Sequence, residues 1–131
     1  MMVRKFRILV VEDDPDDLGL IKMALADEPY EISVAYNGEQ GVEKARAEKP
    51  DAIVLDIMMP EKDGFKACEE LKRDPDCADI PVLMLTAVGQ YFSSTQYAVG
   101  SGMRIEAEDY IEKPVDGDVL RQRLAHFLKR K

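Results

Sequence analysis

The chain has 131 residues, 46% of them hydrophobic, which fits one compact domain with one core and leaves no room for a second. Its apolar runs are too short to cross a bilayer and no secretory segment opens the chain, so we expect a cytoplasmic protein without membrane contact. The formal net charge of −8 argues against direct nucleic-acid binding, which requires clustered Lys and Arg.

Short apolar or β-branched runs recur along the chain and predict strands. Three of these runs are almost continuous in apolar character, which is typical of parallel strands that helices cover on both faces. We therefore expect a mostly parallel sheet. The five predicted strands are Phe6–Val11, Tyr30–Ala35, Ala52–Leu55, Val82–Leu85 and Tyr110–Ile111.

Apolar residues at helical spacing lie between the predicted strands and after the last one. Asp14 with Pro15 is typical of a capped first helical turn, and Asn37 with Gln40 resembles a capping box. The span 89–108 contains three glycines and a broken apolar pattern, so the position of a helix there stays open. Strands that alternate with helices predict an α/β fold, a doubly wound (βα)5 sandwich. The helical faces are Leu18, Ile21 and Leu25; Val42 and Ala45; Phe65, Cys68 and Leu71; and Leu120, Leu124 and Phe127.

Carboxylates follow two of the predicted strands at their carboxyl ends. Glu12 and Asp13 come after the first strand, and Asp56 comes after the third. In a doubly wound sheet these two strands are neighbours, so the acids converge and repel one another unless a cation lies among them. An all-oxygen ligand set that leaves positions for water and phosphate oxygens favours Mg²⁺. The alternative, without a metal site, is that each acid caps a helix and faces water.

The run of acids after the first strand permits two assignments. The pair that joins Asp56 is either Glu12 with Asp13 or Asp13 with Asp14. We favour the first pair, because Asp14 before Pro15 is better explained as a helix cap. The next two residues, Asp16 and Asp17, suit the dipole of the first helical turn and are assigned no chemistry.

Polar residues also follow the fourth and fifth strands, namely Thr86 and Lys113 before Pro114. Together with the acids, they make the chain resemble the receiver domains of two-component response regulators over nearly its whole length. The resemblance implies a five-stranded parallel sheet in the flavodoxin-like order 2-1-3-4-5. It also implies a single receiver domain over residues 1–131, with a core of about 5–129. The matching stretches are Ile8–Asp14, Leu55–Pro60 with Asp63 and Gly64, Leu85–Ala87, and Asp109–Pro114.

The resemblance implies a chemical role for each acid. Asp56 is the expected phospho-acceptor, which takes a phosphoryl group from a phosphohistidine. Asp13 and Asp56 are expected to bind Mg²⁺ directly, Glu12 to help through water, and the backbone carbonyl of Met58 to complete the protein ligands. Such a protein is a signalling switch and not an enzyme, since it catalyses only its own phosphorylation and dephosphorylation.

The same resemblance assigns roles to residues around the acceptor. Thr86 and Lys113 are expected to stabilise the phosphoryl oxygens. Thr86 and Tyr110 are the expected switch pair, although a tyrosine in a strand can also simply be buried. Met58 and Val88 are expected to tune hydrolysis, because neither apolar side chain can orient an attacking water.

The expected phosphoryl donor is a histidine kinase or phosphotransfer protein. The output partner is unknown and would bind the surface of the fourth helix, fifth strand and fifth helix; a phosphorylation-dependent homodimer is also compatible with the resemblance. Two rival functions are an aspartyl-phosphate-forming phosphatase or phosphotransferase, and a degenerate receiver that binds partners without phosphorylation. Met58 argues against the first rival, because such enzymes usually carry a second acid at that position. The filled acceptor, metal, Thr and Lys positions argue against the second.

Overall fold

The structure is a computed structural model that describes residues 5–57, 64–86 and 107–129. Five parallel strands form one sheet in the order β2-β1-β3-β4-β5. Both the predicted strands and the predicted sheet order are confirmed, with β5 one residue longer at each end than expected. The strands are β1 (Phe6–Val11), β2 (Tyr30–Ala35), β3 (Ala52–Asp56), β4 (Val82–Thr86) and β5 (Asp109–Glu112), and the helices are α1 (Pro15–Leu25), α2 (Gly38–Glu48), α3 (Gly64–Arg73) and α5 (Gly117–Leu128).

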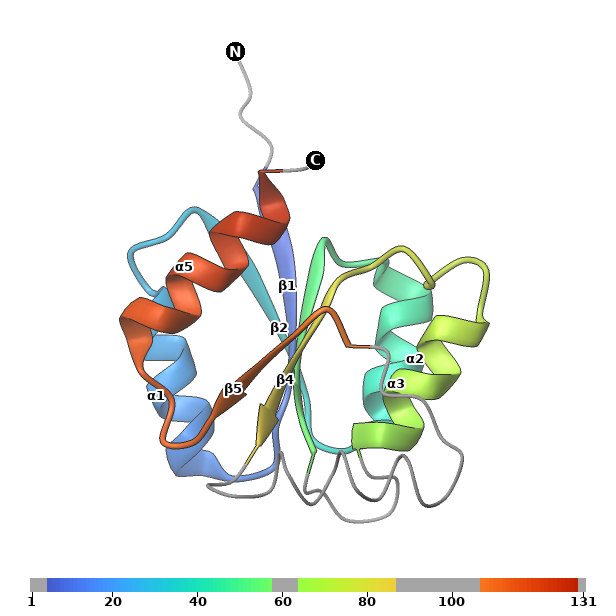
Figure 1. The fold of residues 1–131 in the computed structure, drawn as a ribbon, viewed down its shortest axis with the longest axis horizontal. Coiled ribbons are helices and arrows are strands. Elements are labelled where there is room, and N and C mark those ends of the chain that lie inside the picture. Colours follow the sequence, from blue (N-terminus) through green and yellow to red (C-terminus); the bar gives the residue numbers. More distant parts are fainter. Residues whose placement is uncertain (1–4, 58–63, 87–106, 130–131) are drawn as a thin grey trace.

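Helices cover both faces of the sheet, as the continuous apolar strands predict (Figure 1). Helices α1 and α5 pack on one face, where alternate strand residues such as Ile8 and Val10 are buried. Helices α2 and α3 pack on the other face, over the intervening residues such as Leu9 and Val11. The four predicted apolar faces contribute to these two cores. The sequence leaves the position of a helix within 89–108 open. Residues 87–106 lie outside the described residues, so that position stays open.

The register of the central strands brings the predicted site residues together. Val11 pairs with Leu55 across β1 and β3, so the residues that follow them, Glu12 and Asp56, lie at the same edge. Asp56 pairs in turn with Leu85, which precedes Thr86. This edge is the carboxyl end of the sheet, where ligands bind in doubly wound folds.

At the amino end of the sheet, the buried ammonium of Lys72 ties three segments together. It donates to the backbone carbonyls of Ala78 and Ile80, at 3.2 and 2.8 Å, and to the Glu108 carboxylate at 2.8 Å. Glu108 also accepts a hydrogen bond from the backbone N–H of Val82 at 2.7 Å. The starts of β4 and β5 are therefore fixed relative to α3.

The two ends of the described chain lie close together. Phe6, at the start of β1, and Leu128, at the end of α5, line one surface pocket with Tyr30 and Ala125. Because Phe6 begins β1 and Tyr30 begins β2, this pocket lies at the amino ends of these strands, opposite the edge that carries the acids. None of the described helices combines the length and apolar character needed to span a bilayer.

Candidate functional site

Three acids from two neighbouring strands form a cluster at the carboxyl edge of the sheet. Oxygen atoms of Glu12, Asp13 and Asp56, one from each carboxylate, all lie within 4.8 Å of one another. Glu12 is fully buried and Asp56 is 3% exposed, whereas Asp13 is exposed to solvent. The donors are all oxygens and one side of the cluster is open, which fits a hard divalent cation such as Mg²⁺ that retains several waters.

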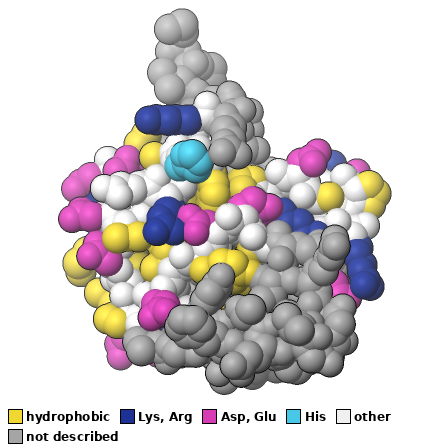
Figure 2. Space-filling model, viewed as in Figure 1, with side chains coloured by type: hydrophobic (Ala, Val, Ile, Leu, Met, Phe, Trp, Pro, Cys, Tyr) yellow, Lys and Arg dark blue, Asp and Glu magenta, His cyan; other side chains and the backbone are white. Residues whose placement is uncertain are grey.

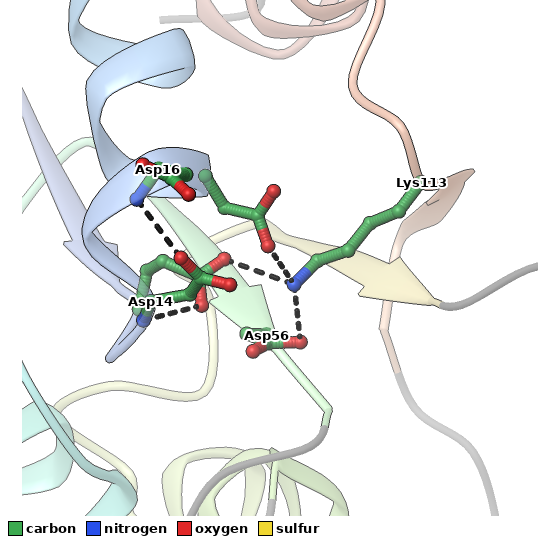
Figure 3. Close-up of polar contacts among 6 residues, drawn as sticks. Asp14, Asp16, Asp56 and Lys113 are labelled. Carbon is green, nitrogen blue, oxygen red and sulfur yellow. Dashed lines mark hydrogen bonds and ion pairs between the residues drawn. The ribbon is translucent and has the colours of Figure 1, made fainter.

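The Lys113 side chain reaches into this cluster from the loop after β5 (Figure 3). Its Nζ lies 3.1 Å from Glu12 Oε1 and 3.2 Å from Asp56 Oδ1. A third carboxylate, that of Asp17, accepts a hydrogen bond from the same ammonium at 2.8 Å. The backbone N–H of Lys113 donates to the Thr86 carbonyl, and the Lys113–Pro114 peptide bond is cis.

The close packing of these charged groups shifts the pKa values of Glu12 and Lys113. Burial, followed by the hydrogen bond and charge of Asp56, raises the pKa of Glu12 from 4.5 to about 8, against the opposing effect of Lys113. Burial lowers the pKa of Lys113, but the hydrogen bond with Asp17 and the charges of Asp56 and Glu12 outweigh it, so the net shift is upward. The ammonium therefore stays charged at neutral pH, and Glu12 holds its proton more tightly than an isolated glutamate does.

The first turn of α1 forms the wall of the site beside Lys113. Asp14 caps this helix, because its side chain accepts a hydrogen bond from the backbone N–H of Asp16 at 2.8 Å, and Pro15 is the first helical residue. The predicted cap is thus confirmed. Leu18 and Ile21 bury the inner face of α1 and fix its position on the sheet. Asp17 directly precedes Leu18 in this helix, and its side chain is 22% exposed.

Thr86 and Tyr110 lie on the neighbouring strands β4 and β5, where Tyr110 pairs with Met84, two residues before Thr86. Thr86 is fully buried, and its hydroxyl has no hydrogen-bond partner among the described residues. Tyr110 is partly buried and packs against the core beneath α2 and α3. Both residues line a cavity of about 320 Å³ with Asp109, Glu112 and Arg123. Arg123 closes one side through a 2.7 Å ion pair with Asp109.

The structure brings together five residues that the sequence singles out: Glu12, Asp13, Asp56, Thr86 and Lys113. Met58 and Val88 lie outside the described residues, so their expected roles stay predictions.

Asp17 is expected from the sequence only to favour the helix dipole, and its contact with Lys113 is the feature that sequence reasoning misses. The contact joins residues 96 positions apart, so no local sequence pattern points to it.

Comparison with known proteins identifies relatives over nearly the whole chain. A family profile described as the response regulator receiver domain matches residues 8–125. The chain is 40% identical over 124 residues to a DNA-binding dual master transcriptional regulator, RpaA, from Synechocystis. This alignment covers 95% of the chain and 49% of RpaA, so the chain spans about half the length of that relative.

Two solved structures have the same fold. The signal receiver domain of a signal transduction histidine kinase from Syntrophus aciditrophicus has a TM-score of 0.83 and 31% identity, over 95% of this chain and 90% of that one. The receiver domain of a sensor histidine kinase from Pseudomonas aeruginosa has a TM-score of 0.82 and 27% identity, over 96% and 99% of the two chains. The latter holds a magnesium ion in its active-site cleft.

Proposed function

Because this chain belongs to the response regulator receiver domain family, we propose that it is a signalling switch in which Asp56 accepts a phosphoryl group from a phosphohistidine. The donor would be a histidine kinase or a phosphotransfer protein. The observation that carries the proposal is the position of the Lys113 ammonium, 3.2 Å from Asp56 Oδ1 beside an acid cluster suited to a metal. These are the parts that phosphoryl transfer to a carboxylate requires.

Each residue of the site has a separate role in the proposed phosphoryl transfer. Asp56 would attack the phosphorus atom through a carboxylate oxygen and form an acyl phosphate as the P–N bond to the donor imidazole breaks. Lys113 and the buried Thr86 hydroxyl would bind the phosphoryl oxygens. Glu12, Asp13, Asp56 and the backbone carbonyl of Met58 would hold Mg²⁺, which supplies positive charge to the phosphoryl group when bound. The buried Thr86 hydroxyl can donate one hydrogen bond to a phosphoryl oxygen without giving up a protein partner among the described residues.

Thr86 and Tyr110 are proposed to relay phosphorylation to a partner surface. Both residues line the 320 Å³ cavity, which offers the space that a change of side-chain packing needs. The proposed output surface comprises β5, α5 and the segment between β4 and β5. Its partner is an unidentified protein or, after phosphorylation, a second copy of this chain.

A protein partner is favoured over nucleic acid by the charge of this surface. Figure 2 shows acidic and basic side chains interspersed around β5 and α5, and the described residues on this face form no continuous basic patch. The net charge of −8 points the same way. RpaA is described as DNA-binding, but the chain covers only 49% of its length. We further propose that residues 1–131 act as one receiver domain in the cytoplasm, with no catalysis beyond the domain's own phosphorylation and dephosphorylation.

The test is labelling with a small acyl phosphate and Mg²⁺, followed by intact mass spectrometry. The wild-type chain should gain one phosphoryl group, EDTA should prevent the gain, and Asp56→Asn should abolish it. Asp79→Asn, which removes an exposed carboxylate before the start of β4, at the opposite end of that strand from Thr86, is the control for an Asp-to-Asn change and should be labelled like wild type. Labelling of Asp56→Asn at the wild-type rate would refute the assignment of the acceptor.

A further inference from the structure

The Lys113 ammonium is shared among three carboxylates that fall into two groups. An ammonium has three N–H donors, and here three carboxylates lie within 3.2 Å of Nζ. Glu12 and Asp56 belong to the acid cluster proposed to bind Mg²⁺. Asp17 lies outside that cluster, on the first turn of α1, and makes the shortest of the three contacts at 2.8 Å.

This arrangement sets up a competition between two cations. Mg²⁺ in the acid cluster would draw on the carboxylates of Glu12 and Asp56, which the Lys113 ammonium also contacts. A divalent ion and an ammonium that share carboxylates repel each other, and solvent screens this repulsion least around Glu12, which is fully buried. The ammonium then needs a partner that the metal does not use.

We propose that Asp17 is a positioning residue, which holds the Lys113 ammonium on the α1 side of the site and so allows Mg²⁺ and Lys113 to occupy it together. This inference rests on the proposed function, since it presumes the Mg²⁺ site. Asp17 suits the task because its helix is fixed by the Asp14 cap and by the burial of Leu18 and Ile21.

If Asp17 only stabilised the start of α1, its loss would affect Mg²⁺ binding no more than the loss of another acid in the same turn. Negative charge in the first turn of a helix favours the helix dipole wherever the side chain points. Asp16 supplies the same charge in the same turn, but it is exposed, and the structure gives its carboxylate no contact with Lys113. Asp16→Asn is therefore a matched control that removes one charge and one dipole interaction and leaves the ammonium contact intact.

The experiment measures the dissociation constant for Mg²⁺ by titration of amide chemical shifts, at fixed pH and ionic strength. Asp17→Asn should weaken Mg²⁺ binding about tenfold. This is the lower end of the loss in metal affinity that follows removal of a residue outside the metal's own ligand shell. Asp16→Asn should weaken it less than about twofold, since exposed charges are screened. Asp17→Glu, which keeps a carboxylate on the same turn, should bind Mg²⁺ more tightly than Asp17→Asn.

A second set of variants tests whether Asp17 acts through Lys113. Lys113→Met removes the competing cation and should tighten Mg²⁺ binding. In that background, Asp17→Asn should have no larger effect than Asp16→Asn. Circular dichroism melting of each variant establishes that it is folded under the titration conditions.

The outcomes separate this inference from the proposed function. If the wild-type chain binds no Mg²⁺, both are wrong. If wild type binds Mg²⁺ but Asp17→Asn matches Asp16→Asn, only the role of Asp17 is wrong. A tenfold loss that persists in the Lys113→Met background would also overturn it, because Asp17 would then act on the metal directly.

Discussion

Glu12 illustrates how a single buried acid responds to its neighbours. It is fully buried next to Asp56, and the Lys113 ammonium partly offsets the repulsion between the two carboxylates. These effects raise the pKa of Glu12 to about 8. Because a cation in the cluster favours the ionised carboxylates, metal binding and loss of a proton from the cluster are linked.

We predict that the metal-free protein loses stability as the pH rises. The folded chain holds the Glu12 proton more tightly than the unfolded chain, in which the pKa is near 4.5. Stabilisation from this group is complete below pH 4.5 and is lost as the pH rises through about 8. With EDTA present, the melting temperature of wild type should fall more between about pH 6 and about pH 9 than that of Glu12→Gln, which does not titrate. Parallel curves for the two proteins would contradict the raised pKa.

At the level of single residues, the sequence predicts chemistry well where the residue follows a strand. Glu12, Asp13, Asp56 and Thr86 follow or end apolar strands, and the order of the sheet alone brings them to one edge. The contact between Asp17 and Lys113 joins residues 96 positions apart. It depends on how α1 and the loop after β5 are oriented, which no local pattern specifies.

Gly64 shows how tightly an element must pack to position the acceptor. It is the first residue of α3, and its backbone N–H donates to the Ile57 carbonyl at 2.9 Å. A Cβ at this position would lie 2.5 Å from the backbone oxygen of Asp56 and 2.7 Å from the Cα of Ile57. Only glycine lets the helix approach the end of β3 so closely.

We predict that Gly64→Ala destabilises the protein and that a similar change in another helix does the reverse. The new methyl group must push α3 away from backbone atoms, at a cost of about 1–3 kcal/mol. Gly19 lies on the exposed side of α1, and apart from its chain neighbours and the adjacent helix backbone no heavy atom lies within 4 Å of an added Cβ. Gly19→Ala should therefore stabilise by about 0.5–1 kcal/mol. Urea unfolding measures both values, and a Gly64→Ala protein as stable as Gly19→Ala would contradict the close packing.

Helices and strands are predicted correctly from the sequence where the pattern of apolar residues is strong. The strands of the central sheet are continuous apolar runs, and α1, α2, α3 and α5 bury the residues that helical spacing places on one face. Two caps, Asp14 and Asn37, mark helix starts because their side chains satisfy the first free N–H groups. The span 89–108 lacks both kinds of signal, since glycines interrupt its pattern.

At the scale of the whole molecule, the site joins segments from both ends of the chain. Residues after β1 and β3 provide the acids, and the loop after β5 provides Lys113. A cation that binds only this assembled site stabilises the folded state by mass action. Binding of Mg²⁺ should therefore be visible in global unfolding as well as at the site.

We predict that Mg²⁺ raises the melting temperature of the protein. At a tenfold excess over the dissociation constant the stabilisation is about 1.4 kcal/mol, or a rise of a few degrees. Asp13→Asn should lose this rise, because it removes one of the three clustered carboxylates. NaCl at the same ionic strength is the control for screening. An equal rise with NaCl, or in Asp13→Asn, would mean that the effect does not come from the cluster.

The position of Phe6 beside Leu128, at the amino ends of the strands, has a practical consequence. A biotin or an affinity handle attached at either end of the described chain would turn the carboxyl edge of the sheet away from a solid support. The acid cluster would then face the flowing solution. Arrays of immobilised protein could thus be screened against candidate donor kinases with every molecule in a similar, accessible orientation.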